Sequence, residues 1–403
     1  MNDSPSLKPK NEPVGDSTFD KRVRRQVTGR VRTYYAIVAP GVEDLCRQEL
    51  IDLGIDAGGI SVEAGGVTFA GRLVDCQLAN LHLRTATRIL MRIETFSATN
   101  ERQLEKKAIG VPWELFLSAG SLPDIKVRSR RSRLHHTEAI GRIIHRAVTH
   151  RLEGLSMGSR QVMPQSLFVR VVQDRFTLSL DSSGAPLYQR GLKIGPARAP
   201  LRETLAAAIL MTAAYDPKQP LVDPLCGSGT FALEAAMMAK RIAPGINRDF
   251  VFMGWPAFGE GQWAFLKRQA ESRNRACNRP LIFASDLDAD ACRRLVATIK
   301  VNGLTDIVRV AQKDLFACEG SQYGSGPGLV TINPPYGIRL GSAKQADDLF
   351  TAICGHLSRR FRGWRVALVV PRRQLLRRLT FPARQLPLFH GGLRLTLVVG
   401  TIK

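Results

Sequence analysis

Hydrophobic and polar positions alternate in short segments through the first part of this 403-residue chain. Residues 34–39, 66–70 and 89–94 have the composition of strands, and residues 42–53 and 75–85 carry apolar side chains at helical spacing. Strands and helices of this length, in this order, predict a small α+β unit over residues 34–100.

A second small unit is expected over residues 101–185. Residues 125–129 predict a strand, and residues 138–152 predict a helix whose apolar positions fall on one face. Residues 167–172 and 175–180 predict a hairpin across Gln173 and Asp174.

The pattern changes again after a connector rich in Gly, Pro and basic residues at 182–200, and residues 186–403 are expected to form one larger α/β domain. Helices are expected from residue 200 and at 231–239, 290–301 and 347–360. Because helices separate the strands, we expect a parallel, doubly wound sheet. The strands are expected at 221–223, 281–285, 308–311, 329–332, 366–370 and 393–401.

The composition changes this picture through its charge. Lys and Arg number 58 against 35 Asp and Glu, a net charge of +23, which favours a polyanionic partner: nucleic acid first, an anionic membrane surface second. No apolar run could span a bilayer, no signal peptide is evident, and the seven cysteines include no Cys-x-x-Cys pair, so we expect a cytoplasmic protein with reduced thiols. Residues 1–33 predict a basic disordered tail, or an arm that lies along phosphates.

The first chemistry-bearing motif is Asp223-Pro-Leu-Cys-Gly-Ser-Gly-Thr230, between a predicted strand and a helix. Gly227 and Gly229 allow the backbone to approach a ligand, and the helix amino terminus favours an anionic group. The motif is neither Gly-x-Gly-x-x-Gly nor a phosphate-binding P-loop. With Asp223 ahead of the glycines, it favours a ligand that presents an amine and a carboxylate, as S-adenosylmethionine does; the alternative is a plain tight turn.

Two further acids follow the next two predicted strands. Asp286 could accept the hydroxyls of a ribose, although it could instead cap a helix. Asp314 could accept a hydrogen bond from an adenine amine, with Leu315 or Phe316 packing on the ring, although a surface turn is an equal alternative.

The fourth motif, Asn333-Pro334-Pro335-Tyr336, ends the strand at 329–332, because neither proline can donate to a sheet. The side-chain oxygen of Asn333 and the carbonyl of Pro334 could bind the hydrogens of a base amine and aim its lone pair at a sulfonium methyl group. Tyr336 could stack on the extruded base. This transfer needs no general base and no metal. The alternative is that the motif is a proline turn without a functional role.

A basic cluster follows the strand at 125–129, and four of the seven histidines lie between 135 and 150. A metal site would need convergent carboxylates or thiolates, which are not evident, so we expect no metal. The two remaining interpretations of the basic cluster are contact with phosphates and a solvated basic helix face.

Together these motifs resemble those of class I S-adenosylmethionine-dependent methyltransferases acting on amino nitrogens of nucleobases. The segments Gln189-Arg-Gly-Leu-Lys193 and Ala199-Pro-Leu-Arg-Glu-Thr-Leu-Ala-Ala-Ala208 are similar to the bacterial 23S ribosomal RNA guanine-N2 methyltransferases. In that family a ferredoxin-like subdomain and a THUMP domain precede a Rossmann-like catalytic domain, and residues 127–137 are similar to the THUMP consensus.

The resemblance implies a role for each of three groups of residues. It implies catalysis at Asn333, Pro334, Pro335 and Tyr336. It implies cofactor contacts at Glu203, Thr204, Asp223, Cys226, Gly227, Gly229, Thr230, Asp286, Leu287, Asp314 and Leu315. It implies RNA contacts at Arg128, Arg130, Arg131, Arg133 and His136.

We therefore expect N2-methylation of guanine in RNA, with 23S ribosomal RNA first and transfer RNA as the nearest rival. A DNA adenine-N6 methyltransferase, a non-catalytic RNA-binding ribosome-assembly factor and a nicotinamide-dependent dehydrogenase are weaker alternatives. Some family members carry a second methyltransferase domain, whose activity we expect to be absent here. The oligomeric state, the target nucleotide and the stage of ribosome assembly stay open.

Overall fold

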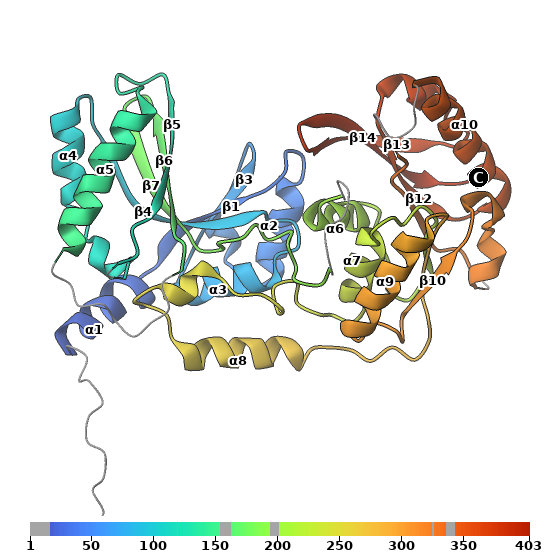
Figure 1. Cartoon of the computed structure of the whole chain (residues 1–403), viewed down its shortest axis with the longest axis horizontal. Coiled ribbons are helices and arrows are strands. Elements are labelled where there is room, and N and C mark those ends of the chain that lie inside the picture. The colour runs from blue at the N-terminus through green and yellow to red at the C-terminus, as the bar shows by residue number, and fades with distance from the viewer. Residues whose placement is uncertain (1–16, 119, 154–162, 194–200, 325, 336–342) are drawn as a thin grey trace, which may run out of the picture.

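The computed structural model describes residues 17–118, 120–153, 163–193, 201–324, 326–335 and 343–403, which form two halves that each centre on a seven-stranded sheet. Figure 1 shows the two sheets side by side along the longest axis of the molecule. No helix among these residues is long and apolar enough to cross a membrane.

The first sheet joins both predicted small units in a single structure. Its strand order is β2-β3-β1-β4-β7-β6-β5, and β4 pairs antiparallel with β7 from Leu90–Asp181 to Ser97–Arg175. The predicted units at 34–100 and 101–185 are therefore two parts of one continuous sheet. The strands are β1 (Arg32–Ile37), β2 (Ile60–Glu63), β3 (Gly66–Gly71), β4 (Arg88–Ser97), β5 (Asp124–Arg130), β6 (Ser166–Val172) and β7 (Arg175–Asp181).

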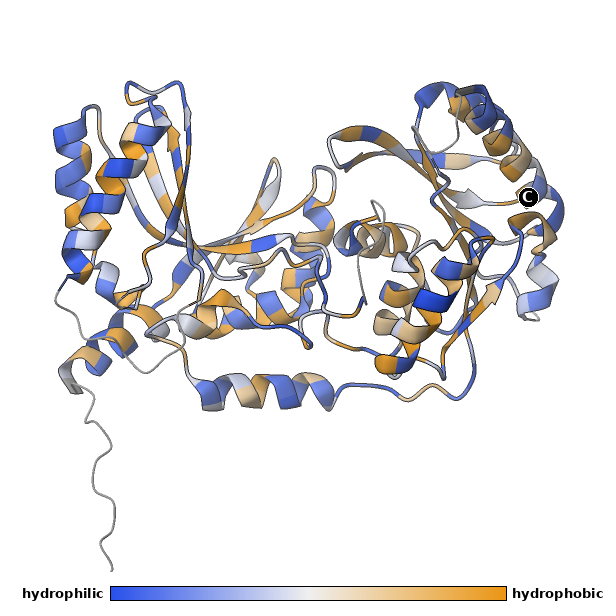
Figure 2. Cartoon of the chain, viewed as in Figure 1, coloured by the Kyte–Doolittle hydropathy of each residue, from blue (hydrophilic) through white to orange (hydrophobic). Residues whose placement is uncertain are grey.

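One face of this sheet carries the core of the first half. Tyr34, Phe69, Met91, Val169 and Leu178, one from each of five strands, lie in the same buried cluster as apolar residues of the surrounding helices. Figure 2 shows these helices with apolar stripes toward the sheet and hydrophilic outer faces. The helices are α2 (Glu43–Asp52), α3 (Leu73–His82), α4 (Glu101–Ile109) and α5 (Thr137–Leu152).

An insertion from the second half completes this core. Phe252, Trp255 and Trp263 lie on a 3-10 turn (Val251–Gly254), on the residue after it, and on α8 (Glu260–Glu271), and all three are buried with the core of the first half. The predicted catalytic region at 186–403 thus contributes to both halves.

The prediction of a disordered tail over residues 1–33 is wrong for residues 17–33. These residues form α1 (Ser17–Val23), a π-helical turn (Arg24–Thr28) and the start of β1, and Val23 and Val27 are buried in the core. Residues 1–16 lie outside the described part of the chain.

Glu114 fixes this amino-terminal arm to α5. Its carboxylate accepts hydrogen bonds from Arg22 at 3.0 Å and from Arg151 at 2.8 and 3.0 Å. Burial alone would raise the pKa of Glu114, but the bonds donated by Arg151 and Arg22 bring it below the ordinary value.

The second sheet has the order β10-β9-β8-β11-β12-β14-β13. Its first five strands are parallel, as predicted, but β14 runs antiparallel to β12 and pairs with β13 in a hairpin. The expectation of an entirely parallel sheet is therefore wrong at this edge. The strands are β8 (Leu221–Asp223), β9 (Ile282–Asp286), β10 (Val308–Gln312), β11 (Leu329–Ile332), β12 (Arg365–Val370), β13 (Ala383–His390) and β14 (Leu393–Thr401).

Two buried clusters cover the two faces of this sheet, as a doubly wound fold requires. Ile282 and Ala367 face one cluster, and Val222 and Val366 face the other. The helices around the sheet are α6 (Glu203–Thr212), α7 (Thr230–Ala239), α9 (Ala289–Val301) and α10 (Ala343–Arg360). Short 3-10 turns lie at Ala57–Gly59, Trp113–Leu115, Leu315–Ala317, Gly320–Tyr323 and Arg373–Arg378.

A buried charge network joins the halves at α7. Glu234 on α7 accepts a hydrogen bond from Arg190 Nε at 3.0 Å and lies 3.7 Å from Arg84 Nη1. Arg190 also donates to the carbonyl of Arg84, whose own amide donates to Glu49 on α2. The connector, the second half and the first half are therefore held at one point.

The packing of the arm generates a stability prediction. Val27→Ala should lower the free energy of unfolding by about 1–3 kcal/mol, because it removes buried methyl groups and leaves a cavity. Chemical denaturation monitored by circular dichroism measures this. Val31→Ala, at a neighbouring side chain that is 59% exposed, is the matched control and should change stability by less than about 0.5 kcal/mol. Equal effects of the two substitutions would contradict the packing described here.

Candidate active site

The parallel strands bring the four predicted motifs to one edge of the second sheet. Spatial neighbours β10, β9, β8 and β11 are followed at their carboxyl ends by Asp314, Asp286, Asp223 and Asn333, respectively. Asp223 is level with Ala284 of β9, and Asp286 is level with Gln312 of β10. The chain turns in opposite directions from β8, which is where ligands bind in open α/β sheets.

Asp223 is a buried carboxylate without a partner. Its side chain is 1% exposed, and neither oxygen accepts a hydrogen bond within the part of the chain that the structure describes. Burial, and next the charge of Asp286, raise the pKa of Asp223 well above its ordinary value. Since an unpaired buried polar group is costly, this site fits a ligand that brings a positive charge or hydrogen-bond donors.

The glycine turn beside Asp223 has the conformation that the sequence required. Gly227 and Gly229 have φ angles of +50° and +73°, in the left-handed region. A Cβ on Gly227 would meet open space, whereas one on Gly229 would overlap the side chain of Leu295 on α9. Gly229 thus allows close packing, and Gly227 leaves room for a ligand.

Asp286 is tied to this turn. Its Oδ2 accepts a bond from the amide of Gly227 at 2.8 Å, and its Oδ1 accepts one from the amide of Asp288 at 3.0 Å. Each carboxylate oxygen can accept a further bond, so a ribose could still be bound. The residue that caps α9 is Asp288 and not Asp286, so the alternative that Asp286 serves as the helix cap is wrong.

Two exposed apolar side chains lie beside these acids. Leu287 after β9 is 63% exposed and Phe316 after β10 is 43% exposed, although both are large and apolar. Leu315, by contrast, is buried in a core cluster. The structure therefore favours Phe316 over Leu315 as the side chain available to a ring near Asp314, whose Oδ1 accepts a bond from the amide of Phe316 at 3.0 Å.

A lysine that the motif analysis did not single out joins two predicted residues. Lys193 Nζ lies 2.7 Å from Glu203 Oε1 and donates to Thr230 Oγ1 at 2.8 Å. The ion pair links the end of the connector to the first residues of α6 and α7. Thr204 and Cys226 are buried, and burial raises the pKa of the Cys226 thiol. Their predicted cofactor contacts stay predictions. Lys193 ends the segment Gln189-Arg-Gly-Leu-Lys193 noted in the sequence, but its contacts with Glu203 and Thr230 depend on partners distant along the chain.

Asn333 holds a second acceptor without a partner. Its Oδ1 is buried and accepts no hydrogen bond from any described residue. Pro334 is buried and Pro335 half-buried, so the loop start is packed. Tyr336 lies outside the described residues.

The predicted RNA contacts lie in the first half, at the outer edge of its sheet. Arg128 and Arg130 are exposed on edge strand β5, and Arg131, Arg133 and His136 are exposed in the turn that follows. The Arg133 amide donates to Asp174 Oδ1 at 2.7 Å, which fastens this turn to the β6–β7 hairpin.

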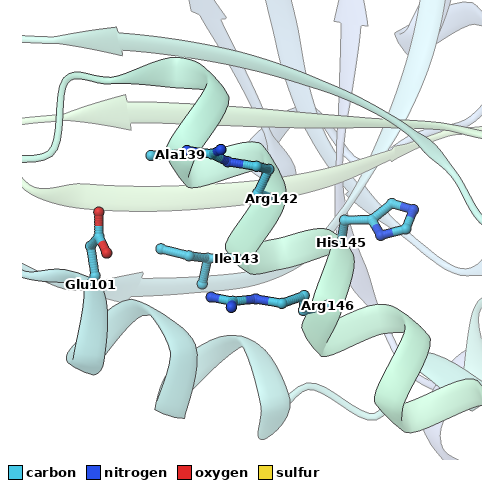
Figure 3. A pocket seen from close by; sticks show the side chains of 6 residues that line it. All are labelled: Glu101, Ala139, Arg142, Ile143, His145 and Arg146. Carbon is cyan, nitrogen blue, oxygen red and sulfur yellow. The ribbon is translucent and has the colours of Figure 1, made fainter.

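A basic pocket lies between α4 and α5 on the helical side of the same half. Figure 3 shows Arg142, His145 and Arg146 of α5 around it, with Glu101 of α4 opposite. Ala139 and Ile143 form its floor. Within the described ranges, no group of three or more His, Cys, Asp or Glu is placed to hold a metal ion.

Comparison with known proteins gives two curated relatives of this chain. YpsC of Bacillus subtilis, provisionally named as an RNA methyltransferase, is 32% identical over 327 residues, which are 79% of this chain and 82% of YpsC. The ribosomal RNA large subunit methyltransferase K/L of Syntrophotalea carbinolica is 32% identical over 378 residues. That match covers 91% of this chain but 53% of the relative, so the chain spans about half the length of that protein.

A solved structure and two family matches cover the fold. SMU.472, provisionally described as a methyltransferase and crystallised with SAH, has a TM-score of 0.82 at 27% identity and matches 93% of this chain and 99% of its own. Residues 33–90 match the RlmL ferredoxin-like domain, and residues 190–398 match the RMKL-like methyltransferase domain. The predicted fold class is confirmed, whereas a THUMP domain at 101–185 stays a prediction. The chain belongs to the RMKL-like methyltransferase family.

Proposed function

We propose that this protein transfers a methyl group from S-adenosylmethionine to the N2 amine of a guanine in RNA, with 23S ribosomal RNA as the substrate and the cytoplasm as the location. The observation that carries the proposal is that Asp223 and Asn333, at the ends of adjacent strands β8 and β11, hold buried acceptor oxygens with no hydrogen-bond partner among the described residues. The Asp223 carboxylate suits a cationic ligand, and the Asn333 side-chain oxygen suits a neutral hydrogen-bond donor.

The residues around Asp223 fit the cofactor along its length. The Asp223 carboxylate would accept hydrogen bonds from its ammonium group, and the turn at Gly227 would approach its aminoacyl end. Asp286 would accept the ribose hydroxyls, while Leu287 and Phe316 would pack on the adenine ring. Asp314 would accept from the adenine amine. SAH in the related structure SMU.472 supports this assignment.

The loop after β11 would act on the substrate amine. The Oδ1 of Asn333 and the carbonyl oxygen of Pro334 would accept the two amine hydrogens, which favours a pyramidal nitrogen and aims its lone pair. The cofactor supplies a methyl group on a positively charged sulfur. As the nitrogen–carbon bond forms and the carbon–sulfur bond breaks, the electron pair returns to sulfur, and the amine then loses a proton to solvent. Tyr336 would stack on the flipped base.

The choice of RNA and of guanine rests on other observations than the loop. The charge of +23 and the exposed cations at Arg128, Arg130, Arg131, Arg133 and His136 support a polyanionic substrate. The guanine and the 23S assignment rest on the quoted motifs and on the K/L relatives named as ribosomal RNA large subunit methyltransferases. Transfer RNA remains the nearest rival substrate.

Asn333→Ala tests the loop. The variant should lose about 100-fold or more in the rate of methyl transfer, because one of two groups that orient the amine is gone. Transfer from labelled cofactor to separate ribosomal and transfer RNA pools, with nucleoside analysis, measures this and identifies the product. SAH affinity should stay within a factor of about two, since Asn333 lies outside the cofactor contacts.

The outcomes of this assay separate the alternatives. N2-methylguanosine in ribosomal RNA supports the proposal, and transfer to transfer RNA alone moves the substrate. RNA binding without any transfer favours a binding factor. Full activity of Asn333→Ala would contradict the proposed role of the loop.

Asp223 gives a pH-dependent prediction for cofactor binding. Its pKa is raised in the free protein, and a bound ammonium group would lower it again. SAH affinity should therefore fall as the pH drops below the raised free-protein pKa, and binding in that range should release a proton. Titration calorimetry in two buffers of different ionisation enthalpy measures both effects.

Asp223→Asn should weaken SAH binding by about 30-fold or more, because truncating one partner of a buried charge pair costs about 2 kcal/mol or more. It should also abolish the proton release. Asp52→Asn, the same change at an exposed position of α2, is the matched control. Unchanged affinity and unchanged proton release in Asp223→Asn would overturn the assignment.

A further inference from the structure

The first sheet has a second face that its core does not use. The residues facing the core alternate along each strand with side chains that lie outside it, and these include Tyr35, Arg92, Lys126, Phe168 and Arg170. We call these five side chains the platform. In Figure 1, α4 and α5 lie on the outer side of β5–β7 and α2 and α3 lie beneath β1, so this face looks toward the half that carries the candidate active site.

The strand register places the platform residues in neighbouring positions. Lys126 of β5 is level with Phe168 of β6, which is level with Ser179 of β7, which in turn is level with Arg92 of β4. The next row begins with Arg128 beside Arg170. Since neighbouring strands are about 4.8 Å apart, the first row extends about 14 Å across the sheet.

Each aromatic ring of the platform lies beside a cation. Lys126 Nζ lies 5.4 Å from the centre of the Phe168 ring, and the Arg92 guanidinium lies 5.3 Å from that of Tyr35. Phe168 is half-buried although its ring lies outside the core cluster, and Arg170 beside it is exposed.

The platform cations have partners but stay partly exposed, with exposed side-chain fractions of 46% for Lys126, 26% for Arg92 and 66% for Arg170. Lys126 pairs with Asp124 at 3.4 Å, and Arg92 and Arg170 lie 3.4 and 3.9 Å from the single carboxylate of Glu63. Exposed pairs of this kind are weak, so a polyanion can replace them.

We propose that the platform binds two or three unpaired nucleotides of the RNA substrate, with a base stacked at Phe168 and phosphates at Arg170 and Lys126. Rings and guanidinium planes stack on bases of any sequence, while the cations follow the backbone. Paired RNA hides its base faces, so a flat aromatic surface selects single strands. That the ligand is RNA rests on the function proposed above; the single-stranded form and the residues come from the sheet itself.

Phe168→Leu tests the stacking, because it keeps an apolar side chain and removes the ring. In the full-length protein, the affinity for a short unpaired oligoribonucleotide of mixed sequence should fall about tenfold, within the range measured for one stacked base. Affinity for a duplex of the same length should stay unchanged. Fluorescence anisotropy of the labelled RNA measures both.

Matched controls lie on α8, on another side of the molecule (Figure 1). Phe265→Leu, at a ring that is 56% exposed, should leave both affinities unchanged. Arg170→Ala should reduce the slope of log affinity against log salt by about one, and Arg268→Ala on α8 should not. Phe168→Trp should retain binding, which separates loss of the ring from misfolding.

Each outcome decides the proposal. The proposal would be overturned if Phe168→Leu left the affinity for single-stranded RNA unchanged, or if Phe265→Leu lowered that affinity equally. It would also be overturned if Phe168→Leu lowered the affinity for duplex equally, or if the protein bound anionic phosphatidylserine vesicles but not RNA. If the platform binds RNA but no RNA pool is methylated, the platform is supported and the proposed function is refuted. If RNA is methylated but Phe168→Leu leaves RNA affinity unchanged, the proposed function is supported and the platform is refuted.

Discussion

The arrangement of the molecule depends on the compensation of one buried negative charge, that of Glu234. A carboxylate that is 1% exposed must be paired, and its partners Arg190 and Arg84 come from the connector and from the first half of the chain. Removing one partner of such a buried pair typically costs about 3–5 kcal/mol. Because Glu234 lies on α7, which begins directly after the glycine turn, the same contact relates the first half to the strand ends at Asp223.

The candidate site includes buried polar groups whose hydrogen-bonding capacity the described residues do not satisfy. Most buried polar groups in proteins have partners, yet Asp223 and the Asn333 side-chain oxygen have none among the described residues. They lie on neighbouring strands at the point where the order of the sheet reverses. Rigid strands on both sides therefore fix two acceptors of different charge at one edge.

The sequence predicted this site better than it predicted the assembly of the halves. Asp223, Asp286 and Asn333 follow short apolar strands directly, so local pattern was enough to place them. The β13 strand was not predicted, and its place at the sheet edge is what allows it to contain Pro387. Lys193 and the buried Val27 depend on partners distant in sequence, Thr230 and the helices of the first half, which no local pattern encodes.

The continuous first sheet has a consequence for how such proteins can diversify. The β4–β7 pairing and the shared core make residues 32–181 a single cooperative unit, with the 251–271 insertion packed into it from the catalytic half. A chimaera cut between the two small units would expose two long strand edges and invite aggregation. Recombination among relatives should therefore exchange the whole first half together with the 251–271 insertion, and a new binding specificity should arise by surface substitution more readily than by exchange of one part of the sheet.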